Sequence, residues 1–132
     1  RALVRRYRIE EADHVVIAGH DRDEVTALAI PDVEACRKLV PQLDKGAPAS
    51  FVLQSPQVRA EIKSRLTALN TFVRGSSFRI ERMIVLEQPP SIDKGEMTDK
   101  GSINQRAVLQ HRADLVDLLY AQAPSPHVIV TD

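Results

Sequence analysis

The sequence predicts an α+β fold: a small antiparallel or mixed sheet of about three strands, with helices packed on it. Short β-branched runs alternate with one-sided helical runs along the chain. The 132 residues suit one domain, and a hydrophobic content of 43% is enough to form a buried core. Aromatic residues make up only 4% of the chain, so the core is expected to consist mainly of Val, Leu, Ile and Ala.

The first half begins with helical sequence and continues as a hairpin. Residues 3–9 predict a short amphipathic helix, and the start at Arg1 inside this pattern suggests a fragment of a longer protein. Residues 14–18 form an apolar, β-branched run typical of a strand buried on both faces. After a polar turn, residues 25–30 predict a second strand closed by Pro31. Strands this close in sequence must pair antiparallel, since a parallel crossover needs many more residues.

Two helices are predicted next, separated by a loop over residues 41–54. Asp32 is a plausible N-cap for a helix over residues 32–40, and Ser55 for a longer helix ending at Gly75. The longer helix should bury one stripe of residues, namely Val58, Ile62, Leu66, Leu69 and Val73.

The last third predicts a strand, an exposed loop and a helix. Phe78, Ile80, Ile84 and Leu86 alternate along the strand, interrupted by Arg82. Residues 91–102 are polar, and Asn104 is a good N-cap for the final helix. Residues 1–122 are therefore expected to form the domain, with residues 123–132 as a flexible tail; within the tail, residues 128–130 could instead pair as an edge strand.

Composition argues against several classes of function. Eighteen basic and 18 acidic residues balance to zero net charge, which argues against nucleic-acid or membrane-surface binding and makes an RNA-binding domain the weakest hypothesis. No apolar run is long enough to span a bilayer, and a cytoplasmic location is expected. Cys36 has the helical spacing of a core residue. His20 lies in an acidic turn without a second imidazole, so no metal site is predicted.

Residues 95–106 combine a lysine, two glycines and several hydrogen-bonding side chains just before a helix. A lysine on such a loop can reach another domain's site and neutralise developing negative charge. Spacing alone favours the alternative, a solvated loop with a capped helix.

A family resemblance gives this loop a more specific interpretation. The run from Thr98 to Leu109, preceded by residues 89–93, resembles the end of feruloyl-CoA synthetases. These enzymes belong to the AMP-forming acyl-CoA synthetase, or adenylate-forming, superfamily. Residues 16–25 resemble the strand–turn–strand of the same enzymes' C-terminal domain, and residues 75–77 also fit. The resemblance covers about residues 13–121 in matching order.

The resemblance implies that the chain is the mobile C-terminal domain of an acid–CoA ligase. The partners implied are a large N-terminal ATP-binding domain of the same polypeptide and a small-molecule carboxylic acid. The complete enzyme would use ATP with Mg²⁺ to make an acyl-adenylate, and the small domain would then rotate so that coenzyme A forms the thioester. We expect the isolated chain to fold, to be inactive and to hold no cofactor, because the phosphate loop belongs to the large domain.

The resemblance also implies site residues, with one departure from the family motif Thr-x-x-Gly-Lys-x-x-Arg. Thr98, Gly101 and Arg106 fall near their places, but Ser102 occupies the lysine position and Lys100 stands two residues earlier. In an extended loop these two side chains would point the same way from starting points about 7 Å apart. The candidate catalytic residue is therefore Lys100, and the candidate nucleotide-binding residues are Thr98, Gly101, Ser102 and Arg106.

Other assignments remain open at this level. Lys94 is a second candidate for the catalytic lysine, and Arg79, Arg82 and Arg106 could contact the phosphates of coenzyme A or be solvated or ion-paired. Because the lysine is displaced from its place in the family motif, an alternative function also remains open: a non-catalytic binding or regulatory module of the same fold.

Overall fold

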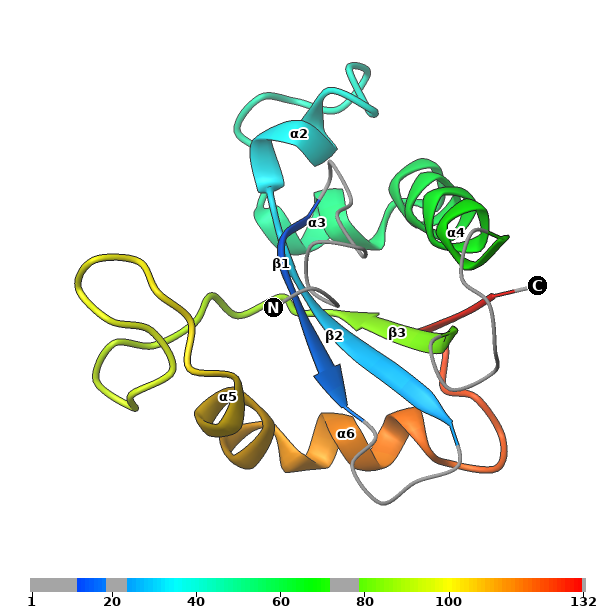
Figure 1. Cartoon of the computed structure of the whole chain (residues 1–132). Coiled ribbons are helices and arrows are strands. Elements are labelled where there is room, and N and C mark those ends of the chain that lie inside the picture. The colour runs from blue at the N-terminus through cyan, green and yellow to red at the C-terminus, as the bar shows by residue number, and fades with distance from the viewer. Residues whose placement is uncertain (1–11, 19–23, 72–78, 132) are drawn as a thin grey trace.

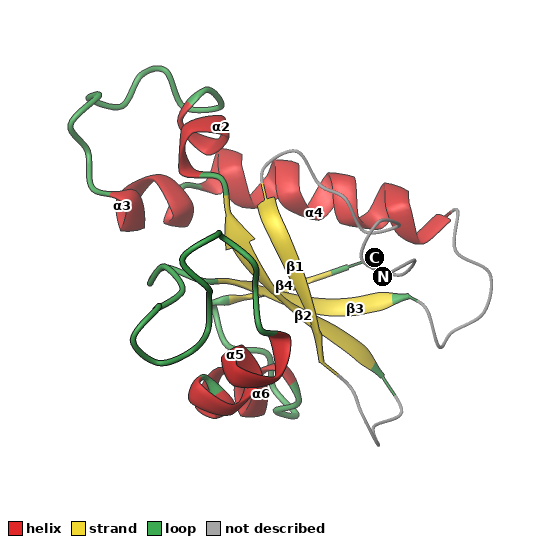
Figure 2. Ribbon diagram, turned by 60° about the vertical axis from the view of Figure 1, so that its left-hand side comes forward, coloured by secondary structure: helices red, strands yellow, loops and turns green. Residues whose placement is uncertain are grey.

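The computed structural model describes residues 12–18, 24–71 and 79–131. These residues form a mixed sheet with helices on both faces (Figures 1 and 2), which confirms the predicted α+β class. The strands lie side by side in sequence order: β1 (Ala12–Ala18), β2 (Val25–Pro31), β3 (Ile80–Val85) and β4 (Val128–Val130). About three strands were expected, and the structure has four. The fourth is β4, so residues 128–130 form the edge strand that was the alternative to a flexible tail over residues 123–132.

The helices occupy two separate parts of the chain. The first group joins β2 to β3: α2 (Val33–Arg37), α3 (Ala49–Gln54) and α4 (Pro56–Thr71). The second group follows β3: α5 (Gln105–His111) and α6 (Ala113–Leu119). None of the helices in the described part of the chain has the length and apolar character needed to cross a membrane.

Strand pairing follows from the length of each connection. β1 and β2 form the predicted antiparallel hairpin, with Val15 opposite Ala29 and Val16 opposite Leu28. β2 and β3 are parallel, because α2, α3 and α4 supply the long crossover that parallel strands need. β4 returns antiparallel to β3.

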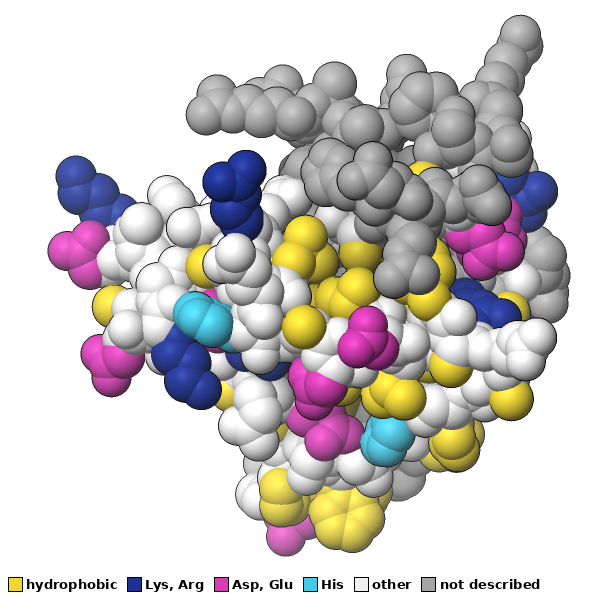
Figure 3. Space-filling model, turned by 90° about the horizontal axis from the view of Figure 1, so that it is seen from below, with side chains coloured by type: hydrophobic (Ala, Val, Ile, Leu, Met, Phe, Trp, Pro, Cys, Tyr) yellow, Lys and Arg dark blue, Asp and Glu magenta, His cyan; other side chains and the backbone are white. Residues whose placement is uncertain are grey.

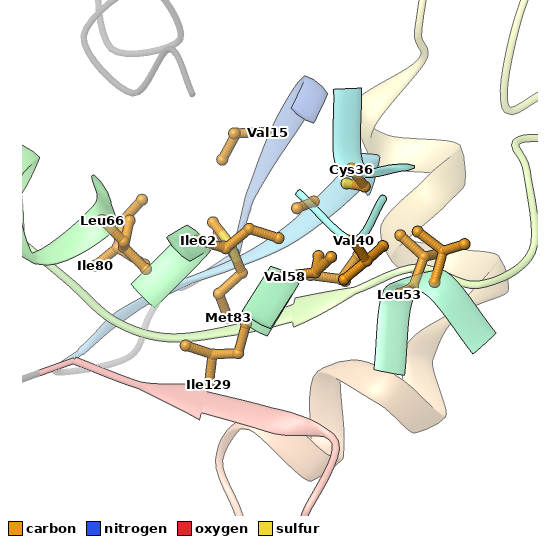
Figure 4. Close-up of a cluster of buried hydrophobic side chains, with 14 residues drawn as sticks. Val15, Cys36, Val40, Leu53, Val58, Ile62, Leu66, Ile80, Met83 and Ile129 are labelled. Atoms are coloured by element: carbon orange, nitrogen blue, oxygen red, sulfur yellow. The ribbon is translucent and has the colours of Figure 1, made fainter. Parts of the chain in front are cut away.

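Both faces of the sheet are buried, each against its own group of helices. On the crossover side, Val15, Ala29 and Met83 pack with residues of α2, α3 and α4, among them Cys36, Ile62 and Leu66 (Figure 4). On the other side, Val16, Leu28 and Ile84 pack with Val108 of α5 and Leu119 of α6. Neighbouring residues of one strand face opposite cores, so the prediction of a strand buried on both faces is confirmed by Val15 and Val16, and the core position of Cys36 is also confirmed.

The predicted alternation along β3 is wrong for Ile80. Val25 pairs with Ile80, but Thr26 pairs with Arg82, so the strand contains an irregularity at Glu81. An extra residue of this kind reverses the faces of the side chains that precede it. Ile80 therefore shares the crossover-side core with Met83, whereas Ile84 and Leu86 lie in the other core.

Arg82, which interrupts the apolar pattern, follows the regular alternation of β3 and lies on the α6 side with Ile84 and Leu86. Its guanidinium Nη1 donates to the carbonyl oxygens of Leu119 and Ala121 at 3.2 and 2.6 Å. Leu119 is the last residue of α6 and Ala121 lies two residues beyond it, a region where helices leave acceptors without intrahelical partners. Arg82 thus fixes the C-terminal end of α6 to the sheet.

All three predicted N-caps are confirmed. The side chains of Asp32, Ser55 and Asn104 accept hydrogen bonds from backbone amides three residues later, at 3.1, 3.3 and 3.2 Å. Several boundaries were wrong: the first of these helices ends at Arg37 rather than residue 40, and residues 41–54, expected to be a loop, contain α3. α3 forms there because Val52 and Leu53 are buried in the core, a tertiary contact that overrides weak local signals.

The expected final helix is divided into α5 and α6 at Arg112, whose φ of −117° and ψ of 34° lie outside the helical region. Some expectations fall outside the described residues: the helix over residues 3–9, the turn containing His20, and the assignments of Val73, Gly75 and Phe78.

Asn70 is a buried polar residue on the core face of α4, with 4% of its surface exposed. Its Nδ2 donates to the carbonyl oxygen of Ile80 at 2.9 Å, and its Oδ1 accepts from the amide of Ile80 at 3.1 Å. The amide group therefore satisfies both backbone groups at the start of β3 and joins the strand to the helix before it.

We predict that Asn70→Ala lowers the free energy of unfolding by about 1–3 kcal/mol, because the buried amide of Ile80 loses its acceptor. Urea denaturation of the chain measures the change. Ser64→Ala, on the exposed side of the same helix, should change stability by less than about 0.5 kcal/mol. Equal effects of the two substitutions would contradict this role for Asn70.

Candidate functional site

The candidate site is the loop that joins β3 to α5, which projects from the body of the molecule (Figures 1 and 2). The loop contains two consecutive turns. In the first, the amide of Glu96 donates to the carbonyl oxygen of Ser91 at 2.9 Å, and Gly95 has a φ of +74°. The second turn, residues 97–103, is a small hairpin that we call the lysine hairpin.

The lysine hairpin is closed by backbone hydrogen bonds around Lys100. Met97 and Ile103 form an antiparallel bridge. The amide of Gly101 donates to the carbonyl oxygen of Thr98 at 3.0 Å. The amide of Thr98 donates to the carbonyl oxygen of Ser102 at 2.9 Å. Gly101 has a φ of +87°, the left-handed conformation that three-residue hairpin loops require at this position.

This geometry corrects the extended path assumed for the loop. Lys100 and Ser102 flank the left-handed Gly101 in a tight turn, so the spacing rule for extended chains does not apply to them. Both residues are exposed, with Lys100 in the turn of the hairpin, and the hydroxyl of Thr98 accepts a hydrogen bond from the amide of Ser102 at 3.0 Å. Four predicted site residues, Thr98, Lys100, Gly101 and Ser102, are therefore brought together at one exposed turn.

The other predicted site residues lie apart from this turn. Arg106 is exposed in the first turn of α5, and Lys94 is exposed in the preceding turn of the loop. Arg82 is half-buried and engaged with the end of α6. Arg79 is half-buried beside β3.

Glu96, which the sequence analysis did not single out, lies at the centre of the loop. Only 2% of its side chain is exposed. Its carbonyl oxygen accepts from the amide of Asn104 at 2.9 Å. Its carboxylate Oε1 accepts from the amide of Ser91 at 2.9 Å. One residue thus connects the first turn, the lysine hairpin and the start of α5.

The carboxylate of Glu96 also forms a two-bond ion pair with Arg112, the residue between α5 and α6. Nε of Arg112 donates to Oε2 at 2.9 Å, and Nη2 donates to Oε1 at 3.1 Å. The same Nη2 donates to the carbonyl oxygen of Pro89 at 3.1 Å. Arg112 is 12% exposed, so both charges are shielded from water and the geometry of the pair is strongly directional.

The hydrogen bonds from Arg112 hold the pKa of Glu96 below its ordinary value, although burial acts in the opposite direction. The amide of Ser91 and the positive charge of Arg112 lower the pKa further. Glu96 is therefore an anion near neutral pH, as the ion pair requires.

An apolar cavity of about 500 Å³ lies beside the lysine hairpin. Met97, Gly101 and Ile103 line it from the hairpin, and Ala49 and Leu53 line it from α3. Among the described residues three large apolar side chains are exposed: Phe51 on α3 at 65%, Ile92 in the loop at 55%, and Val130 of β4 at 38%. The loop thus combines two exposed lysines, Lys94 and Lys100, with apolar surface.

Seen from below, basic and acidic side chains are interspersed on the side where the loop projects (Figure 3). Among the described residues visible in this view, the basic side chains do not form the continuous groove that nucleic-acid backbones bind. Among the described residues, no group of three or more His, Cys, Asp or Glu side chains could hold a metal ion.

Comparison with known proteins relates the chain to carboxylate-activating enzymes. It is 30% identical over 111 residues to a long-chain-fatty-acid–CoA ligase of Gallus gallus, a match that covers 83% of the chain and 14% of the ligase. It is 26% identical over 109 residues to a chloroplastic long-chain-fatty-acid–[acyl-carrier-protein] ligase of Arabidopsis thaliana, a match that covers 83% of the chain and 13% of that ligase. The chain therefore spans about a seventh of the length of these curated relatives. No protein-family model matches it.

A solved structure has the same fold. The A-PCP didomain of carboxylic acid reductase from Segniliparus rugosus, determined in complex with AMP, superposes with a TM-score of 0.65 at 18% identity, covering 92% of this chain and 16% of the didomain. The two ligase matches support the adenylate-forming superfamily, and the didomain shows a shared fold. They do not single out the feruloyl-CoA synthetases.

We predict that Glu96→Gln destabilises the chain at neutral pH by about 1–3 kcal/mol, because Arg112 loses a buried charged partner. Since the folded-state pKa of Glu96 is lowered, its contribution is fully present above the unfolded-state pKa of about 4.3 and is lost as pH falls through the folded-state value. The difference between wild type and Glu96→Gln should therefore narrow in acid. Urea unfolding at neutral pH and in acid measures this.

The matched control is Glu61→Gln, which removes the carboxylate of a more exposed pair with Arg65 on α4. Surface pairs contribute little, so this substitution should cost less than about 1 kcal/mol. A stability difference between wild type and Glu96→Gln that stays constant across this pH range would contradict the assignment.

Proposed function

We propose that this chain is the mobile C-terminal domain of an AMP-forming acid–CoA ligase, and that its lysine hairpin contributes Lys100 to the adenylation step. The observation that carries the proposal is the position of Lys100, an exposed cation in a hydrogen-bonded turn, on a fold shared with an adenylate-forming enzyme. The match to two ligases across 83% of the chain supports the same reaction class.

The proposed reaction has two steps. In the first, a carboxylate oxygen of the acid attacks the α-phosphorus of ATP, and pyrophosphate leaves as the acyl-adenylate forms. In the second, a thiol attacks the acyl carbon and AMP leaves. Negative charge shifts onto phosphate oxygens in the first step, and a fixed ammonium group near them lowers the barrier.

The hairpin is suited to present such a group. Lys100 has a long side chain on an exposed turn, and Gly101 adds no side chain that would keep a phosphate away. Thr98 and Ser102 place hydroxyl groups on the same turn. ATP and Mg²⁺ would be bound mainly by the large domain, so this chain alone is expected to form no acyl-adenylate.

Two thiols are reasonable acceptors for the second step. One relative is named as a CoA ligase and the other as an [acyl-carrier-protein] ligase. We favour coenzyme A, whose phosphates could be contacted by exposed Arg106. Arg82 is less suited to this role, because its guanidinium already holds the end of α6.

The alternative function is a non-catalytic binding or regulatory module of the same fold. The observation that favours it is Ser102, which stands where the resemblance calls for lysine. Such a module would keep the fold and the hairpin but would tolerate loss of Lys100 without a catalytic defect.

We predict that Lys100→Ala in the complete protein slows adenylation by at least about a hundredfold, as expected when one electrostatic contact to a developing charge is lost. Thioester formation from preformed acyl-adenylate should change little. Pyrophosphate release with long-chain fatty acids and with ferulic acid measures the first step, and CoA consumption measures the second.

Two further lysine variants make this test specific. Lys94→Ala asks whether the other exposed lysine of the loop carries the role instead. Lys45→Ala removes an exposed lysine between α2 and α3, away from the loop, and should leave both steps unchanged. If adenylation survives in Lys100→Ala, Lys100 is not the catalytic lysine, and if it also survives in Lys94→Ala, the non-catalytic alternative gains support.

A further inference from the structure

We propose that the Glu96–Arg112 ion pair is the positioning element of the lysine hairpin, setting where Lys100 stands relative to the rest of the domain. The inference rests on the proposed function and deepens it. Neither residue would touch substrate; both would act through the hairpin.

Both ends of the hairpin are attached to Glu96. Its first residue, Met97, follows Glu96 directly in the chain. Its last residue, Ile103, precedes Asn104, whose amide donates to the carbonyl oxygen of Glu96 at 2.9 Å. Movement of Glu96 therefore displaces the hairpin as a unit, because the internal bonds from Thr98 to Ser102 keep its own shape.

Glu96 is in turn attached to the helical layer through Arg112. The guanidinium group makes two hydrogen bonds to the carboxylate, at 2.9 and 3.1 Å. Arg112 stands between Val108 of α5 and Leu119 of α6, both fully buried against the sheet. The pair thus connects the loop to elements whose positions the core determines.

The hairpin has few other means of orientation. Residues 98–102 are all exposed, and Met97 and Ile103 are only half-buried at the edge of the apolar cavity. Apolar contacts tolerate sliding, whereas a two-bond pairing of guanidinium and carboxylate fixes both distance and plane. A buried ion pair adds little net stability compared with apolar packing, so its directionality is the property that suits a positioning role.

Positioning has a large effect on rate. A displacement of about 1 Å in a catalytic group can cost on the order of a hundredfold. Loss of the pair should therefore affect the step that uses Lys100 and spare the step that does not. A purely structural role would instead impair both steps together, through loss of folded protein.

The test uses the complete protein and four variants: Glu96→Gln, Arg112→Lys, Lys100→Ala and the control Glu61→Gln. Glu96→Gln removes the negative charge and keeps the shape of the side chain. Arg112→Lys keeps the positive charge and removes the planar guanidinium group that makes two hydrogen bonds to the carboxylate. Adenylation is followed by pyrophosphate release, and the second step by thioester formation from preformed acyl-adenylate. Soluble, folded fractions are matched by circular dichroism before the rates are compared.

We expect the adenylation kcat to fall by roughly 10- to 100-fold in Glu96→Gln and by a smaller factor in Arg112→Lys, with the KM for ATP changed less than about threefold. Thioester formation should stay within about twofold of wild type, and Glu61→Gln should match wild type in both steps.

Three results would overturn the inference. If Lys100→Ala loses adenylation but Glu96→Gln and Arg112→Lys retain it, the pair does not position the lysine, and the proposed function stands. If the pair variants lose both steps equally at matched folded fractions, their role is structural. If the wild-type protein releases no pyrophosphate with any acid, the proposed function fails and the inference with it.

Discussion

The carboxylate of Glu96, in the exposed loop between β3 and α5, pairs with the guanidinium group of Arg112, which lies between α5 and α6. Glu96 accepts hydrogen bonds from Arg112 and from the amide of Ser91, and its own backbone bonds to Ser91 and Asn104. Glu96 therefore joins the first turn, the lysine hairpin and the start of α5, and its side chain is only 2% exposed. Because a buried charge is costly unless it is paired, the loop cannot move far from Arg112 without a large loss of free energy.

The sheet fixes the positions of the two helices between which Arg112 lies. Both of its faces are buried, so α5 and α6 pack on a surface whose other side is held by α2, α3 and α4. Arg82 lies on the same face of β3 as Ile84 and Leu86, and there it donates to two carbonyl oxygens at the end of α6. One arginine thus holds the end of α6 while another, at its start, holds the loop. This arrangement connects the core, through α6, to the turn that carries Lys100.

The sequence predicted features with local causes and missed those with distant ones. Caps at Asp32, Ser55 and Asn104 and the β1–β2 hairpin depend on residues within a few positions of one another, and the structure confirms them. α3 was missed because it depends on burial of Val52 and Leu53 against residues far along the chain. The predicted face of Ile80 was wrong because one extra residue in a strand does not change the amino-acid pattern in a recognisable way. Glu96 and Arg112 lie 16 residues apart on polar segments, where spacing does not distinguish a buried pair from two solvated charges.

The central claim is that the Glu96–Arg112 pair holds the lysine hairpin in place. Amide hydrogen exchange of wild type and Glu96→Gln tests it most directly, because Thr98, Gly101, Ser102 and Asn104 all donate backbone amides within this loop. The account predicts that exchange at these four amides accelerates by at least about tenfold in the variant, while amides of the β1–β2 ladder exchange as in wild type. Unchanged exchange at the four loop amides would contradict the claim, as would equal acceleration in the β1–β2 ladder.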